Sequence, residues 1–398
     1  MGQRPTSQQI PVVVLAGFLG SGKTTLLNHL LHRSGGSRIG AVVNDFGSIE
    51  IDAMAVAGAL GDSTVSLGNG CLCCAVDVSE LDGYLERLAR PEAGIDVIVI
   101  EASGLAEPQE LVRMLLASEQ PGVVYGGLVE VVDAAEFDDT RAKHPEIDRH
   151  LALADLVVVN KTDRASDAER VLALVRSLGD GAAVVPATYG RVDPAFLYDC
   201  RPSEERVGQL SFDDLHDHSE GGAHTGHLHA AYDTLSFVSD RPLDPRRLMR
   251  FLDSRPEGLY RIKGYVDFGP YDPRNRYAVH AVGRFLRFYP EPWASADAAQ
   301  GDAAQGDAAQ ADAEQPRDAG DVRRTQLVLI GTGIDAAALG EELGACRRGA
   351  DAPPADEHGM WGVLRYVTDG EDPDAEEPRG PEPDGAEPDG EVPGDDTF

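Results

Sequence analysis

The fold is decided by eight residues near the amino terminus, Gly17-Phe18-Leu19-Gly20-Ser21-Gly22-Lys23-Thr24. They follow an apolar run at residues 12–16 that predicts a buried strand, and they precede a segment with helical spacing at residues 25–31. A strand, the pattern G-x-x-x-x-G-K-T and a helix, in this order, form a phosphate-binding loop, or P-loop. A simple turn is the alternative interpretation, and the flanking strand and helix argue against it.

This loop predicts phosphate binding. The backbone N–H groups of a glycine-rich turn can approach phosphate oxygens closely, and a helix beginning near Gly22 adds the partial positive charge of its N-terminus. We expect Lys23 to reach the β- and γ-phosphates and the Thr24 hydroxyl to face Mg²⁺. The residues predicted to contact the nucleotide here are Gly17, Gly20, Ser21, Gly22, Lys23, Thr24 and Thr25.

Composition limits the class of protein. The chain has 398 residues, of which 42% are hydrophobic, and this is enough for two globular domains and a tail. No apolar run approaches the ~20 residues of a membrane-spanning helix, and residues 1–9 lack the apolar core of a signal peptide. We therefore expect a cytoplasmic protein with no membrane partner.

The net charge of -33 is unevenly distributed along the chain. Residues 295–321 carry seven acids and one base, and residues 351–398 carry sixteen acids and two bases, so these segments contribute -6 and -14. The remainder is mildly acidic. Because the sequence has no basic stripe, we do not expect nucleic acid to be a partner.

A second motif supports nucleotide binding. Residues 96–100 predict an apolar strand that ends in Glu101. This is the Walker B arrangement, in which an acid at the carboxyl end of a strand joins the Mg²⁺ shell. Gly104 then stands where its backbone N–H would meet the γ-phosphate. A loop with a capping acid is the alternative, and the upstream P-loop argues against it.

An acidic loop lies between the two motifs. Residues 39–45 predict a strand that runs into a loop extending to residue 52, a region that usually senses the γ-phosphate in P-loop nucleotidases. Asp45, Glu50 and Asp52 are candidates to face Mg²⁺ or a second metal ion. Asp52 is the first choice for a catalytic role. The alternative is a solvated acidic surface.

A third motif predicts which nucleotide base the protein binds. A strand at residues 156–159 runs into Asn160-Lys161-Thr162-Asp163, the N-K-x-D pattern that reads guanine. Asp163 can accept hydrogen bonds from guanine N1–H and from its exocyclic amino group, and adenine offers no such pair of donors. The Lys161 stem can lie against the purine. We therefore expect GTP rather than ATP, which disfavours a P-loop kinase or ATPase.

Strands and helices alternate throughout this part of the chain. Residues 128–132 predict a further strand, and residues 184–188 predict the final strand and the loop on the base side of the nucleotide. This alternation predicts an α/β fold, a P-loop GTPase domain with a mainly parallel sheet and helices on both faces.

Three thiols fall within four residues after a glycine-rich turn, at Cys71, Cys73 and Cys74. Thiolates are soft ligands that suit zinc, and three of them leave a fourth position open, which suits passing a metal on. A redox pair or buried structural thiols are the alternatives.

Farther along, a histidine-rich segment predicts auxiliary metal binding, with a solvated linker as its alternative. Its histidines are His216, His218, His224, His227 and His229.

A second domain is predicted after the histidines. Strands at 234–238, 259–268, 277–282, 285–289 and 326–330 and helices at 245–252 and 336–346 predict a small α+β domain with its helices on one face. The repeat Gly-Asp-Ala-Ala-Gln at 301–305 and 306–310 predicts a disordered insertion. Residues 361–367 predict one edge strand. We expect the chain to divide into four parts. A GTPase domain at residues 1–212 is followed by a His-rich linker at 213–231. A C-terminal domain at 232–368, which contains the insertion 294–322, is followed by a disordered acidic tail at 369–398.

Together these motifs resemble the CobW-like P-loop GTPases, a family of metallochaperones related to the nickel-inserting GTPases of urease and hydrogenase maturation. The resemblance covers about residues 10–200, 230–292 and 322–348. It is carried by residues 17–24, Asn44-Asp45-Phe46-Gly47, Gly70-Cys71-Leu72-Cys73-Cys74, residues 101–108 and residues 160–163.

The resemblance implies a weak GTPase whose nucleotide state controls a metal site. It implies that Cys71, Cys73 and Cys74 bind zinc or cobalt. It also implies that Lys23, Thr24 and Glu101 serve the phosphates and Mg²⁺, while Asn160, Lys161 and Asp163 recognise guanine.

The leading hypothesis is a GTP-hydrolysing metallochaperone that delivers zinc to a zinc-requiring client protein. Its catalytic residues would be Lys23, Thr24, Glu101 and Asp52. One alternative is a zinc buffer or sensor with incidental GTPase activity, and another is cobalt delivery for corrinoid or cobalt-enzyme maturation. We expect a monomer or a weak homo-oligomer.

Overall fold

The structure is a computed structural model, and two sheets within one compact unit, Met1–Val367, dominate it. The residues that it describes are 9–34, 36–43, 64–66, 78–104, 106–199, 232–254, 256–293, 323–349, 352–356 and 358–367. The predicted histidine-rich linker, the predicted insertion 294–322 and the predicted tail lie outside these residues.

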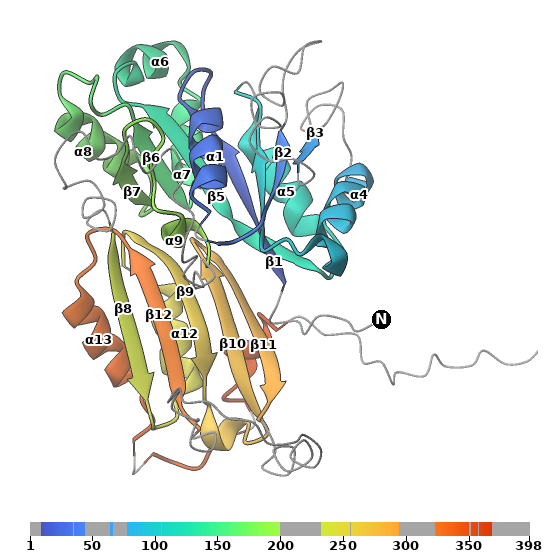
Figure 1. The fold of residues 1–398 in the computed structure, drawn as a ribbon. Coiled ribbons are helices and arrows are strands. Elements are labelled where there is room, and N and C mark those ends of the chain that lie inside the picture. Colours follow the sequence, from blue (N-terminus) through green and yellow to red (C-terminus); the bar gives the residue numbers. More distant parts are fainter. Residues whose placement is uncertain are drawn as a thin grey trace, which may run out of the picture. The chain divides into compact units, whose positions relative to one another are not determined.

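The first sheet has seven parallel strands in the order β3-β2-β4-β1-β5-β6-β7 (Figure 1). The strands are β1 Ile10–Ala16, β2 Ile39–Val43, β3 Thr64–Ser66, β4 Val97–Glu101, β5 Val123–Asp133, β6 Leu156–Asn160 and β7 Ala183–Pro186. Those in the middle of the sheet are rich in Val and Ile and buried on both faces, as parallel strands covered by helices should be. The predicted parallel sheet is confirmed, and the short strand β3 was not anticipated.

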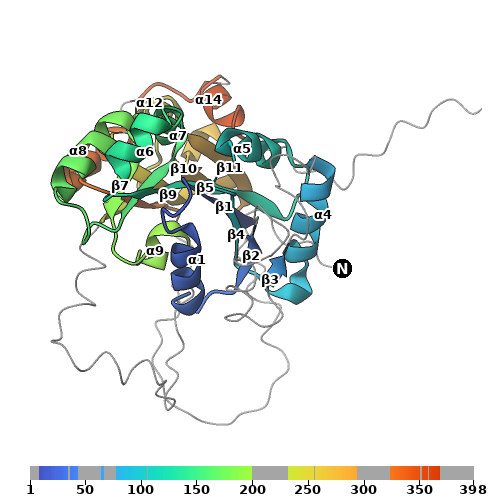
Figure 2. The same ribbon diagram turned by 90° about the horizontal axis from the view of Figure 1, so that it is seen from above.

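Helices cover both faces of this sheet (Figure 2). One face packs against α1 Lys23–His32 and α9 Pro194–Leu197. The opposite face packs against α4 Val78–Ala89, α5 Pro108–Ala117, α6 Phe137–Lys143, α7 Ile147–Leu153 and α8 Ala168–Leu178. A 3-10 turn, η3 Pro91–Ala93, precedes β4. Among the described helices, none is long and apolar enough to span a bilayer.

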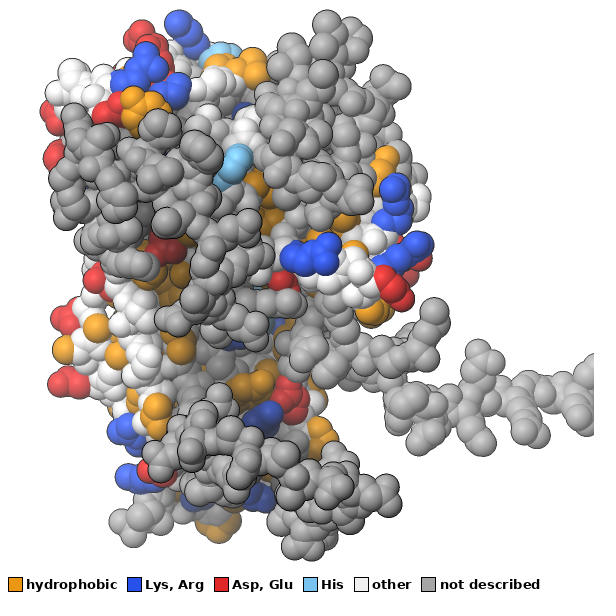
Figure 3. All heavy atoms as spheres, in the orientation of Figure 1, with side chains coloured by type: hydrophobic (Ala, Val, Ile, Leu, Met, Phe, Trp, Pro, Cys, Tyr) orange, Lys and Arg blue, Asp and Glu red, His pale blue; other side chains and the backbone are white. Residues whose placement is uncertain are grey.

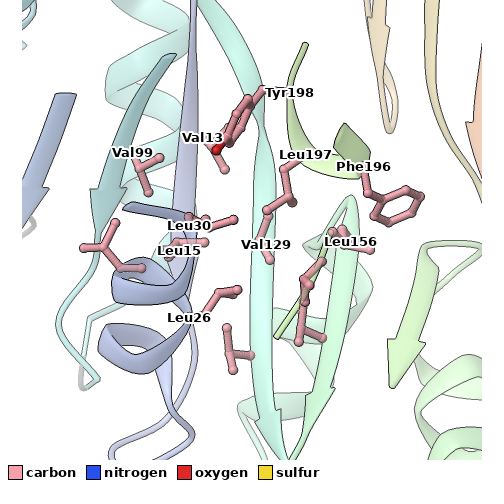
Figure 4. Packing of buried hydrophobic residues seen from close by; sticks show 14 of the residues in the cluster. Val13, Leu15, Leu26, Leu30, Val99, Val129, Leu156, Phe196, Leu197 and Tyr198 are labelled. Carbon is pink, nitrogen blue, oxygen red and sulfur yellow. The ribbon is translucent and has the colours of Figure 1, made fainter. Parts of the chain in front are cut away.

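The core beneath α1 holds the P-loop helix on the sheet (Figure 4). Leu26 and Leu30 of α1 belong to the same buried cluster as Val13 and Leu15 of β1 and Val129 of β5. All five side chains have 0% relative exposure. Since α1 starts at the end of the P-loop, this packing fixes the direction in which the loop presents its backbone.

The second sheet has five antiparallel strands in the order β11-β10-β9-β12-β8. The strands are β8 Asp233–Ser239, β9 Leu259–Val266, β10 Asn275–Val282, β11 Phe285–Pro292 and β12 Thr325–Gly331. The helices α12 Pro245–Asp253, α13 Ala336–Ala345 and α14 Trp361–Leu364 share one buried cluster with this sheet, and a 3-10 turn, η5 Gly269–Tyr271, follows β9. The predicted α+β domain with helices on one face is confirmed.

The edge strand predicted at residues 361–367 is wrong. These residues begin with the helix α14, and only Val367 makes an isolated parallel bridge, to Phe288 of β11. Met360 and Val363 are both buried, whereas Trp361 is 61% exposed. Apolar residues three positions apart place one face of a helical turn on the core, and this packing overrides the strand propensity of the segment.

The second sheet meets the first at the amino ends of the parallel strands. The Gly258 N–H donates to the Gly181 carbonyl at 3.0 Å, just before β7. The His280 Nε2 atom lies 2.9 Å from the carbonyl of Tyr125, near the start of β5. The P-loop follows the carboxyl end of β1, so these contacts lie at the opposite edge of the sheet from the P-loop.

Strand β5 carries a buried acid in its interior. Glu130 of β5 is 2% exposed and pairs in register with Ala16, the last residue of β1 before the P-loop. Among the described residues, its Oε2 atom has no hydrogen-bond partner. Burial raises the pKa of Glu130 to about 8, with the nearby Lys23 charge acting in the opposite direction.

We expect a Leu26→Ala substitution to lower the free energy of unfolding by about 2–5 kcal/mol, because it leaves a cavity under α1. Urea unfolding followed by circular dichroism measures this loss. The matched control is Leu116→Ala in α5, whose side chain is 51% exposed and which should change stability by less than about 0.5 kcal/mol. Equal losses in the two variants would contradict the packing described for α1.

We also expect the stability of the protein to fall between about pH 4.5 and pH 8 because of Glu130. Its folded-state pKa lies above its unfolded value, so in this range the folded state holds a proton that the unfolded chain has lost. The Glu130→Gln variant should therefore gain stability relative to the parent protein as pH rises through this window, by about 3 kcal/mol at pH 7 compared with pH 4. Urea unfolding at pH 4, 7 and 9 checks this, and a constant difference would disprove the shift.

Candidate nucleotide-binding site

The P-loop turn depends on glycine at two positions. Gly17 has a φ of 138° and Gly22 a φ of 105°, both in the region that side chains other than glycine rarely adopt. A Cβ on Gly17 would lie 2.3 Å from the Val131 carbonyl oxygen, and one on Gly22 would lie 2.3 Å from the Asn160 side-chain nitrogen. The loop can therefore follow this path only without side chains at these points.

Lys23 and Thr24 begin helix α1 next to the Walker B acid. The Lys23 Nζ atom donates to the carbonyl of Gly17 at 3.0 Å and to that of Phe18 at 3.4 Å. The Thr24 hydroxyl donates to Glu101 Oε1 at 2.7 Å. Glu101 lies at the end of β4 and is 3% exposed. A hydroxyl and a carboxylate at this distance form the all-oxygen donor set that Mg²⁺ prefers, so the residues fit this ion.

Ser21 adds a further sign of a ligand site. Its Oγ atom is buried and has no hydrogen-bond partner among the described residues. A Cβ on Gly17 would lie 2.9 Å from this oxygen, so the hydroxyl lies directly beside the loop. A buried hydroxyl without a partner is unfavourable in the protein alone, and a phosphate oxygen in the loop would accept a hydrogen bond from it.

The loop after β4 approaches the P-loop closely. A Cβ on Gly104 would lie 2.9 Å from the Leu19 backbone nitrogen and 3.0 Å from its Cα atom. The structure therefore brings the predicted γ-phosphate contact at Gly104 beside the predicted phosphate-binding loop. The P-loop also contacts His144, whose ring lies 4.3 Å from the Phe18 ring between centroids.

Asn160 joins the predicted guanine reader to the P-loop. Its side chain is 1% exposed, donates from Nδ2 to the Ser21 carbonyl at 3.0 Å and accepts at Oδ1 from the Gly190 N–H at 2.9 Å. Lys161, with a φ of 59°, donates to the Gly20 carbonyl at 2.6 Å. The phosphate side and the base side of the predicted site therefore lie at one edge of the sheet.

Asp163 lies on the same loop as Lys161 and is exposed, so its carboxylate is accessible to a base. The loop is held in place by Thr162, whose hydroxyl donates to the Ala187 carbonyl at 3.0 Å. Residue 187 follows β7 directly, where a base-side loop was predicted.

Two residues of this site were not singled out from the sequence. Asp133, at the end of β5, accepts from Lys161 Nζ at 2.7 Å and so orients the lysine stem. An acid at the carboxyl end of a predicted strand was the available signal for Asp133. Glu130 had no such signal. It interrupts an apolar run that predicts a strand buried on both faces, where an acid is exceptional.

Several predicted site residues lie outside the described residues. They are Asp45, Glu50, Asp52, Cys71, Cys73, Cys74, His216, His218, His224, His227 and His229. Within the described part of the chain, no group of three or more His, Cys, Asp or Glu side chains is placed to hold a metal ion. The one described cysteine is Cys346, which is buried.

Comparison with known proteins matches both parts of the chain. Residues 11–186 match the CobW/HypB/UreG nucleotide-binding domain, and residues 232–347 match the cobalamin synthesis protein cobW C-terminal domain. The chain is 31% identical to the zinc chaperone CobW of Pseudomonas aeruginosa over 379 residues, which cover 85% of this chain and 92% of that protein.

Two other relatives carry similar names. The zinc chaperone CobW of a Sinorhizobium species is 30% identical over 335 residues, covering 74% of this chain and 91% of that protein. The zinc-regulated GTPase metalloprotein activator 1 of Schizosaccharomyces pombe is 33% identical over 200 residues, covering 47% of this chain and 48% of that protein. The chain therefore belongs to the CobW family of P-loop GTPases, with a CobW/HypB/UreG nucleotide-binding domain followed by a CobW C-terminal domain.

Proposed function

We propose that this chain is a GTP-hydrolysing metallochaperone that binds zinc at Cys71, Cys73 and Cys74 and transfers it to a client protein. The proposal rests above all on the shared edge at which Thr24, Glu101 and Asn160 meet. GTP binding requires phosphate contacts and base contacts on one edge, and the predicted contacts of both kinds lie there. The relatives named as zinc chaperones support zinc as the cargo.

The nucleotide step follows from the positions of the side chains. Lys23 now bonds to the carbonyls of its own loop and would exchange these acceptors for the β- and γ-phosphates. Thr24 and Glu101 would hold Mg²⁺, which when bound neutralises charge on the phosphates. Asp163 would accept hydrogen bonds from the two guanine donors, while Asp133, which accepts from Lys161, would keep the Lys161 stem beside the purine. We assign Asp52 to the switch that senses the γ-phosphate.

The zinc step is argued from the thiols. Three thiolates form a site with an open fourth position, so a client ligand can enter before the metal leaves. The cysteines fall within residues 11–186, the part that matches the nucleotide-binding domain, so the nucleotide state can act on them within one domain. The histidines between residues 216 and 229 would collect zinc at lower affinity.

A zinc buffer or sensor is the second candidate. Five of the eleven histidines fall between residues 216 and 229, and this density favours storage of several ions. Delivery of cobalt to a corrinoid or a cobalt enzyme is a third, because thiolate and imidazole ligands accept both metals. The effect of nucleotide on metal affinity separates delivery from storage.

We expect Asp163→Asn to weaken GDP binding by roughly 30-fold, about 2 kcal/mol, because the amide offers a donor where guanine also offers one. ADP binding should not change. Titration with fluorescent GDP and ADP analogues measures both affinities.

Asp167→Asn is the matched control for this experiment. Asp167 caps α8 by accepting from the Arg170 N–H, and asparagine caps a helix equally well. The control should bind GDP normally. If Asp163→Asn also binds GDP normally, guanine is not read at Asp163.

We expect a non-hydrolysable GTP analogue to tighten zinc binding tenfold or more relative to GDP, a coupling of about 1.4 kcal/mol. Competition with a chromophoric chelator in the presence of Mg²⁺ measures zinc affinity in each nucleotide state. Cys71→Ala should lower zinc affinity in both states and leave GDP binding unchanged, whereas Cys346→Ala should leave zinc binding unchanged. Equal zinc affinity in the two nucleotide states would favour the buffer instead.

A further inference from the structure

An exposed aromatic side chain stands on the loop that follows β7. Tyr189 is 70% exposed, and its side chain makes no hydrogen bond and no ring contact within the described part of the chain. A single exposed hydrophobic side chain is ordinary, and on the face shown in Figure 3 such side chains are scattered among polar and charged ones. What distinguishes Tyr189 is its backbone conformation and its position.

Tyr189 has a backbone conformation that tyrosine rarely adopts. Its φ is 52°, and the next residue, Gly190, has a φ of 66°. The Arg191 N–H donates to the Thr188 carbonyl at 3.0 Å, which closes a turn around the two residues. Turns whose two central residues have positive φ favour glycine, asparagine and aspartate, so a tyrosine at this position is strained. Burial of the ring does not offset the strain, because the ring is mostly exposed.

Strained residues of this kind gather at the predicted base site. Within the described ranges, three residues other than glycine have a positive φ, and they are Lys161, Asp180 and Tyr189. Two of the three lie on loops that the Asn160 side chain joins, since its Oδ1 atom accepts from the Gly190 N–H at 2.9 Å. Backbone strain is typically retained where a functional site requires it.

The turn that carries Tyr189 is fixed against its neighbours. Thr162 donates to the Ala187 carbonyl twice, from its backbone N–H at 3.2 Å and from its hydroxyl at 3.0 Å. A Cβ on Gly190 would lie 2.7 Å from the Leu26 backbone nitrogen, so the turn sits directly on α1. These contacts hold Tyr189 beside the loop of Asp163, the predicted reader of the guanine edge.

Lys161 and Tyr189 belong to opposite sides of the loop that follows β6. In the sheet, β6 lies between β5 and β7. The Lys161 ammonium donates to Asp133, at the end of β5, at 2.7 Å, whereas Tyr189 follows the end of β7. A base held at Asp163 would therefore have the lysine stem on its β5 side and the tyrosine on its β7 side.

We propose that the Tyr189 ring stacks on the guanine base, on the face opposite the Lys161 stem. The stacking rests on the proposed nucleotide binding and adds a contact to it. A purine has two apolar faces, and an aromatic ring suits the face that the lysine stem leaves open, because offset stacking buries apolar area of both rings. Stacking does not read the edge of a base, so Tyr189 supplies affinity while guanine selectivity stays with Asp163.

Calorimetric titration of the full chain with GDP and Mg²⁺ tests the stacking. Tyr189→Ala should weaken GDP binding about tenfold, whereas Tyr189→Phe keeps the ring and should bind GDP within about twofold of the parent protein. Leu116→Ala is the matched control, since it removes an exposed apolar side chain from α5 and should leave GDP affinity unchanged.

Inosine diphosphate separates stacking from a structural role. It lacks the exocyclic amino group that Asp163 is predicted to recognise and keeps the purine face. If Tyr189 stacks, Tyr189→Ala weakens the binding of GDP and of inosine diphosphate by the same factor. If Tyr189 only positions the loop of Asp163, the ratio of the two affinities changes in this variant, and stacking is refuted.

Tyr189→Gly provides a second check. Glycine relieves the strain of the positive φ, so the unliganded variant should unfold at a urea concentration no lower than that of the parent, while its GDP affinity falls as in Tyr189→Ala. The proposal is overturned if the parent binds GDP and Tyr189→Ala binds it equally well, or if Tyr189→Phe loses as much affinity as Tyr189→Ala. Failure of the parent protein to bind GDP would instead refute the proposed nucleotide site, and the stacking with it.

Discussion

The nucleotide-binding edge depends on one buried amide. Asn160 uses its side chain to hold the P-loop carbonyl of Ser21 and the backbone of Gly190, so three loops from three strand ends share one anchor. Because the amide fills the space beside residue 22, only glycine fits at this position, which directly precedes helix α1. A donor or acceptor lost at this depth would leave partners unsatisfied on both sides, which costs more than the bond itself contributes. The predicted phosphate side and the predicted base side are therefore joined through this one side chain.

Much of this arrangement could be predicted from the sequence. The P-loop, Walker B and N-K-x-D motifs each follow an apolar run rich in β-branched residues, and parallel strands place their carboxyl ends at a common edge. That rule alone brings Thr24, Glu101 and Asn160 together, as the structure shows. The second sheet was also predictable, since β12 alternates between buried and exposed residues and β10 and β11 are joined by a short turn at residues 283–284.

What escaped prediction depended on packing between distant segments. The pattern of residues 361–367 fits a strand, and only the core around Met360 and Val363 selects a helix. Asp133 and Glu130 gain their importance from neighbours that lie far away in sequence, Lys161 and Lys23. The ion pairs of Arg261 and Lys263 with Asp199 are of the same kind, because they join residues from two domains. Such contacts have no local signature in a single sequence.

The helix α14 has a practical consequence for spectroscopy. The chain has two tryptophans, and both belong to the C-terminal part of the fold, Trp361 in α14 and Trp293 directly after β11. Indole emission therefore reports on that domain, while the nucleotide-binding domain contributes only tyrosine emission, as from Tyr125 and Tyr198. Comparing the two signals during denaturation would show whether the domains melt together or separately, with no label attached to the protein.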